Sequence, residues 1–214
     1  MWRFATMQAD EAHVSARCRR DEQGYALLLV MILAVLVSGF VGAALPLSFT
    51  ETRAASHARD VVAWKAAAEG ALDAVLGSLE PVGSWNDLLA GAVRGPVFVP
   101  VGLDLAAATA EVERKWGTLL DRGADTPRWT LVGAGPADRW FGNTAAGVPG
   151  ATLAVWVADD GADGDGNPFR DNNGRILVHA EALAATGGRA STTALVERSG
   201  PAPRPTRRVA WWAS

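Results

Sequence analysis

Cysteine is nearly absent from this chain of 214 residues, which contains one, Cys18. A single cysteine cannot form an intramolecular disulfide, and any thiol chemistry would depend on that one residue. The residues before it, Val14 to Arg17, are too polar for a lipoprotein signal, so we do not expect Cys18 to be lipidated. Lysine is also scarce: Lys65 and Lys115 are the two lysines, and Arg supplies the other basic residues.

Several functional classes lack their usual sequence signals. The formal net charge is -3, without a basic patch, so we do not expect nucleic acid to bind directly. The chain has no Gly-rich phosphate loop, no H-E-x-x-H zinc pattern and no serine in a nucleophile-elbow context. Beyond residue 24 the histidines are His57 and His179, and we expect His179 to be a packed or surface residue of a strand. An enzyme is therefore not predicted.

A long apolar run begins directly after a charged segment that ends in Gly24. The residues from Tyr25 to Thr50 carry no charge. A secretory signal has an apolar core of about 7–15 residues and is cleaved after it, whereas this run is longer and its small residue precedes it. About 20 apolar residues at 1.5 Å each span a hydrocarbon core of about 30 Å. The sequence predicts a retained transmembrane helix at 25–50.

The charges beside this helix predict its orientation. Arg17, Arg19 and Arg20 lie on the N-terminal side, whereas Glu51 is the first charge on the other side. Basic residues cluster at the cytoplasmic end of a membrane helix. We therefore expect a single pass through the inner (cytoplasmic) membrane, with everything after residue 50 outside the cytoplasm.

A second helical segment is predicted at 51–80. Its larger apolar residues recur every three or four positions, which is the spacing of one helix face. They are Val61, Trp64, Ala68, Leu72, Val75 and Leu79. Pro81 cannot continue a helix, so we expect an end near Leu79. The simplest interpretation of this apolar stripe, without any partner, is that it packs onto the chain's own globular domain at 81–214.

The pattern after residue 96 changes to short β-like runs between turns. Alternating or continuous apolar runs bounded by Gly, Pro and Asn are typical of antiparallel strands. We expect strands at 97–101, 128–132, 152–158, 176–182, 192–197 and 208–212, a helix at 105–120 capped by Asp104, and a hairpin tip at Gly187-Gly188. The predicted fold class is α+β: a long N-terminal helix, half transmembrane and half amphipathic, packed on a mostly antiparallel sheet.

An acidic loop after the third predicted strand is the candidate metal site. Its oxygen-bearing side chains are Asp159, Asp160, Asp163, Asp165, Asn167, Asp171, Asn172 and Asn173. Hard oxygen ligands at alternate positions suit calcium, although Pro168 and Gly174 break the EF-hand pattern. One interpretation is a non-EF calcium loop that Asp171 or a backbone carbonyl completes. The other is a solvated turn whose Asp and Asn side chains accept backbone hydrogen bonds. Calcium is the only cofactor for which the sequence has candidate ligands.

Tryptophan is abundant, with nine residues in the chain. A sugar- or surface-binding face is one interpretation, especially for Trp211-Trp212 near the C-terminus. Core packing accounts better for most of them, because Trp buries a large area in a small domain.

Three stretches of this sequence resemble one known family. They are the junction at Gly24 with its apolar helix, the helical segment Ala63 to Leu72, and the acidic loop from Val157 to Val178. Together they are similar to type IV pilin-like proteins, and within these to the minor-pilin group with a PilX N-terminal domain. The helical segment resembles the A-x-x-A-A-E-x-G-L pattern of that group, apart from one inserted-looking Ala.

The resemblance implies a processing event and a set of partners. A prepilin peptidase would cleave between Gly24 and Tyr25, remove the leader 1–24 with Cys18, and methylate the new amino group. The apolar helix would hold the subunit among inner-membrane lipids. It would later pack against other minor pilins and the major pilin in a filament.

Leu29 departs from the family pattern. Most pilins have a Glu at this position, and that carboxylate is thought to neutralise the N-terminal amine of a neighbouring subunit. An unpaired charge in an apolar filament core is costly, so a subunit without the carboxylate fits a low-copy place at the tip or in a priming complex. Two alternatives remain: the type II secretion pseudopilin at the pseudopilus tip, which typically lacks this Glu too, and an unrelated membrane-anchored extracytoplasmic binding protein.

Overall fold

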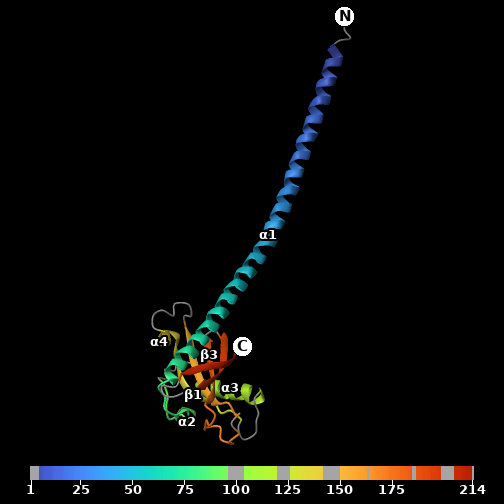
Figure 1. Ribbon diagram of the computed structural model, residues 1–214. Helices are drawn as coiled ribbons and strands as arrows, with labels where there is room; N and C mark the ends of the chain where they lie inside the picture. The colour runs from blue at the N-terminus through green and yellow to red at the C-terminus, as the bar shows by residue number, and fades with distance from the viewer. Residues whose placement is uncertain are drawn as a thin grey trace. The chain divides into compact units, whose positions relative to one another are not determined.

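A computed structural model describes residues 5–95, 104–119, 126–141, 150–162, 164–184, 187–198 and 205–213, with no account of the side chains of 5–23, 44–48 and 213. The strand expected at 97–101 and the loop residue Asp163 lie outside the described residues. The elements are α1 (Ala5–Leu79), α2 (Trp85–Leu89), α3 (Leu105–Leu119), β1 (Thr130–Pro136), α4 (Ala137–Phe141), β2 (Ala151–Asp159), β3 (Arg175–Ala184), β4 (Arg189–Arg198) and β5 (Thr206–Ala213) (Figure 1).

The five strands form one antiparallel sheet in the order β1-β2-β3-β4-β5. The α+β class with an antiparallel sheet is therefore confirmed, as is the turn at Gly187-Gly188 between β3 and β4. The strand expected at 128–132 is displaced in the structure. The observed strand, β1, begins at Thr130 and continues to Pro136. Its second half is Gly-Ala-Gly-Pro, which has little strand propensity, and the register shifts between Leu131 and Gly133.

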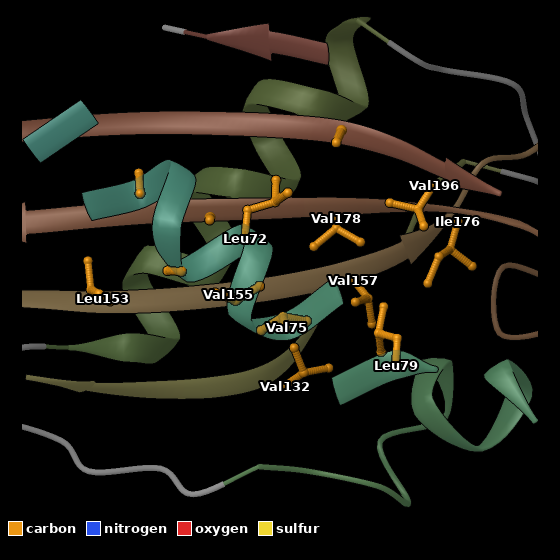
Figure 2. Close-up of a cluster of buried hydrophobic side chains, with 14 of the residues drawn as sticks. Leu72, Val75, Leu79, Val132, Leu153, Val155, Val157, Ile176, Val178 and Val196 are labelled. Carbon is orange, nitrogen blue, oxygen red and sulfur yellow. The ribbon is translucent and has the colours of Figure 1, made fainter. Parts of the chain in front are cut away.

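The helix α1 covers one face of the sheet with its last turns. Leu72, Val75 and Leu79 are buried against valines and isoleucine from β1 to β4 (Figure 2). The i, i+3, i+4 spacing predicted this face, and the helix ends at Leu79 as expected from Pro81. Val61, two turns before the buried part, is exposed. The stripe packs onto its own domain from Trp64, which is partly buried, to Leu79.

The helix α3 covers part of the opposite face. Asp104 Oδ1 accepts hydrogen bonds from the N–H groups of Ala106 and Ala107, each at 3.0 Å, which confirms the expected cap. Ala108, Val112 and Trp116 of α3 are buried in a second cluster with residues of the sheet. The sheet therefore has two apolar faces because successive side chains in each strand point to opposite sides.

The chain divides into two compact units, residues 1–56 and 57–214. The first contains a helical stretch, Gly24–Ala43, of 20 residues with a mean hydropathy of 2.7. Among the described residues it is the one stretch long and apolar enough to cross a membrane, a criterion that a signal sequence near an N-terminus also meets. The sheet, α2, α3 and α4 belong to the second unit.

Candidate functional site

The proposed processing junction lies inside α1. Gly24 and Tyr25 are both helical, and a Cβ added at Gly24 would meet no atom within 4 Å. Tyr25 is 70% exposed and Leu29 is 53% exposed. Apolar side chains in a continuous exposed row need lipid or other apolar helices around them, because exposure to water is costly. Leu29 is one more apolar side chain in this row, and it places no carboxylate there.

The acidic loop between β2 and β3 is held by hydrogen bonds from its own backbone. Asp160 Oδ1 accepts from Ala162 N at 3.1 Å and from Asn173 Nδ2 at 3.0 Å. Asp165 Oδ1 accepts from Asn167 N at 2.8 Å, and Asn167 Oδ1 accepts from Phe169 N at 3.1 Å. The three bonds from backbone N–H groups form Asx-type turns, in which a side-chain oxygen accepts from the N–H two residues on, whereas the bond from Asn173 joins two side chains.

Asp171 anchors the end of this loop to the sheet. Its Oδ1 accepts hydrogen bonds from Gly174 N at 2.7 Å and Arg175 N at 3.1 Å, and its own N–H donates to Asn86 Oδ1 at 2.8 Å. Burial raises the pKa of the Asp171 carboxyl, and the hydrogen bonds from Gly174 and Arg175 oppose that shift. The contact with Asn86 joins the loop to α2.

The loop's fitness for calcium can be judged from its donor groups. Within the described ranges, no three or more His, Cys, Asp or Glu side chains gather closely enough to hold a metal ion. Oxygens of Asp160, Asp165 and Asp171 already accept amide hydrogen bonds, so a bound cation would have to share them. Asp159 differs from the others because its residue is fully buried at the end of β2. Calcium binding by this loop stays a prediction.

A buried polar cluster on the α3 face was not predicted from the sequence. His179 is 0% exposed, with Nδ1 2.6 Å from Thr193 Oγ1 and Nε2 3.1 Å from Glu181 Oε1. The imidazole thus bridges a hydroxyl group and a carboxyl group inside the domain. Buried polar groups are costly unless bonded in this way.

Charged residues extend the cluster to α3. Arg189 Nε lies 3.8 Å from Glu181 Oε2, and its Nη1 lies 2.6 Å from Glu111 Oε1. The hydrogen bond from Arg189 lowers the pKa of Glu111, and the same bond raises the pKa of Arg189. Glu111 belongs to α3 and Arg189 to β4, so this pair links the helix to the sheet at the surface.

Aromatic rings surround the buried histidine. Ring centroids of Trp116, Trp129 and Trp156 lie 6.0, 5.6 and 5.9 Å from that of His179. Beside them, between α3 and the outer strands, lies a cavity of about 550 Å³ that Trp116, Trp212 and Thr193 line. The expectation that most Trp pack in the core is confirmed for Trp116, Trp129 and Trp156, whereas Trp212 is 46% exposed.

One sequence signal could have revealed this cluster. His179 and Glu181 are two apart in a predicted strand, so they share a face. The adjacent expected strand would bring a further residue opposite, but which one depends on the register, which a sequence does not specify.

Protein-family models, curated proteins and solved structures were each compared with this chain, and none of the three comparisons gave a match.

Proposed function

We propose that this chain is a minor pilin of a type IV pilus, belonging to the tip or priming complex that starts the filament. The observation that carries the proposal is the order of features along α1. A charged leader ends at Gly24, a 20-residue apolar stretch follows, and the last turns of the same helix form the core of an antiparallel α+β domain. A secretory signal would be removed together with its apolar core, so it would leave no such helix on the domain.

The charges around the helix support the direction of insertion. Arg17, Arg19 and Arg20 precede the apolar stretch and would remain in the cytoplasm. Cleavage after Gly24 would then free the amine of Tyr25 at the cytoplasmic end of the helix. A row of exposed apolar side chains from Leu27 to Val41 suits lipid before assembly and neighbouring helices after it.

Leu29 supports a place at the end of the filament. In a helical array, a buried amine needs a partner of opposite charge, since an unpaired one costs several kcal/mol or shifts to its neutral form. A subunit with Leu29 cannot give that partner to the next subunit's amine. Repeated use along the shaft would multiply the cost, whereas one copy at the tip or in a priming complex avoids it.

The tip pseudopilin of type II secretion is the nearest alternative, because it also typically lacks the carboxylate. That group usually carries a large inserted helical domain. In the part of this chain that the structure describes, the helices outside α1 have 5, 15 and 5 residues. The small α2, α3 and α4 favour the pilus.

Filament assembly tests the proposal. Deleting the gene should greatly reduce the number of surface pili while the major pilin stays in the membrane, and the intact gene should restore them. The Leu29→Glu variant should restore pili as well, with more subunit per pilus in sheared fractions. Normal piliation in the deletion strain, together with loss of protein secretion, would instead favour the pseudopilin.

A further inference from the structure

The cavity between α3 and the outer strands has the size and lining of a ligand site. Its volume of about 550 Å³ falls within the ~300–1,000 Å³ of small-molecule sites. The rings of Trp116 and Trp212 form walls, with centroids 6.3 Å apart and planes at 68°. Leu177 and Leu195 complete the apolar lining.

Trp212 differs from the other aromatic residue beside it in sequence. Trp211 is engaged by its own domain, since its Nε1 donates to Thr192 Oγ1 at 2.6 Å and Lys65 Nζ lies 5.5 Å from its ring centroid. Trp212 lines the cavity on the other face of β5 and is 46% exposed. An indole face beside a cavity offers a flat apolar platform for a ligand.

The polar residues of the lining decide the chemistry of that ligand. Thr193 is buried and its hydroxyl is engaged by His179 Nδ1, so the charged side chains of the lining are left to recognise a ligand. The Asp160 carboxylate can only accept hydrogen bonds, whereas the side chains of Lys115 and Arg175 can only donate them. A fitting ligand therefore presents both donors and acceptors around an apolar face.

We propose that this cavity binds a neutral carbohydrate, with a pyranose ring lying against Trp212. A pyranose has a C–H face for the indole and hydroxyls that both donate and accept. A purely apolar ligand would desolvate the charged side chains of Asp160, Lys115 and Arg175 without making polar contacts to them. A simple anion would face Asp160, and a simple cation would face Lys115 and Arg175. The site does not depend on whether the chain is a pilin.

Ligand titration tests the proposal on the full chain. The protein is held in micelles of a polyoxyethylene detergent, because alkyl glycosides would compete for the cavity. Methyl glycosides of neutral hexoses and N-acetylhexosamines are titrated with saturation-transfer NMR as the readout. We expect at least one glycoside to bind with a millimolar Kd. Trp212→Ala should weaken binding by about ten-fold or more, whereas the control Trp211→Ala should leave the Kd unchanged.

A further variant separates recognition from folding. Lys115→Ala changes an exposed position of α3, so it should fold normally and still weaken binding. The proposal is overturned if no glycoside binds, if binding survives both Trp212→Ala and Lys115→Ala, or if cyclohexanol binds the cavity while every glycoside fails.

Discussion

His179 and Thr193 face each other across β3 and β4, and the imidazole Nδ1 lies 2.6 Å from the hydroxyl oxygen. They are the middle of a row that crosses four strands, from Trp156 in β2 to Trp212 in β5. A buried polar pair thus sits in an otherwise aromatic layer. It connects the interior of the domain with the cavity that Thr193 lines.

Removing the Thr193 hydroxyl should show how much this pair contributes to the free energy of unfolding. Thr193→Val leaves the buried Nδ1 without its partner, so the free energy of unfolding should fall by about 1–3 kcal/mol. The double variant Thr193→Val/His179→Leu removes both groups and should lose less than the sum of the two single variants. Denaturant unfolding of the four proteins measures this coupling. Strict additivity would mean that the two side chains do not interact.

The hairpin tip between β3 and β4 lies against α1 through Gly188 and Trp64. A Cβ at Gly188 would lie 1.9 Å from Trp64 Cη2. We expect Gly188→Ala to lower the free energy of unfolding by about 1–3 kcal/mol through overpacking. Adding Trp64→Leu should recover part of that loss. The control is Gly77→Ala in α1, where a Cβ meets nothing within 4 Å and should stabilise by about 0.5–1 kcal/mol. Equal effects at both glycines would contradict the packing.

Acid should weaken the link between β3, β4 and β5 at Glu197. Hydrogen bonds from Arg207 and then Arg175 lower the pKa of this carboxyl in the folded protein. Its stabilising contribution is therefore present above the ordinary carboxyl pKa of about 4.3 and is lost as the pH falls through the lowered value. Melting temperatures measured from pH 6 to pH 3 should fall less for Glu197→Gln than for the wild type. Parallel curves of melting temperature against pH for the two proteins would show that Glu197 does not contribute to the loss of stability in acid.

Calcium should stabilise the domain if the acidic loop binds it. A free calcium concentration ten times the Kd would raise the free energy of unfolding by about 1.4 kcal/mol. The double variant Asp163→Ala/Asp165→Ala should abolish the shift, whereas Asp138→Ala, an exposed acidic residue of α4, should retain it. The measurement is the melting temperature with calcium and with a chelator. No shift in the wild type favours the hydrogen-bonded turn.

Local signals in the sequence predicted most of the elements. The spacing from Ala68 to Leu79 and the proline at 81 predicted where α1 packs and ends. Alternating or continuous apolar runs bounded by turn residues predicted β2 to β5, because these patterns depend only on neighbouring residues. The short helices α2 and α4 gave no such periodicity, since each has five residues.

Tertiary register explains what sequence reasoning missed at the candidate site. Thr193 meets His179 because β3 and β4 pair in one of several registers, and a shift by one residue would place different side chains on this face. Trp211 and Trp212 lie on opposite faces because successive side chains of a strand alternate, and the pairing of β5 with β4 places Trp212 opposite Thr193. The sequence also shows that the acidic residues of the loop lie close together along the chain. Which amide each one binds depends on the backbone path of the loop, and the sequence does not specify that path.

The N-terminus of the membrane-bound protein tests the central claim most directly. Mass spectrometry of the N-terminal peptide should be carried out on protein from cells with and without prepilin peptidase. The minor-pilin account predicts a chain that begins at a methylated Tyr25 when the peptidase is present, and one that still carries residues 1–24 when it is absent. A chain that retains its leader in both strains, or one cut after the apolar helix, would contradict it.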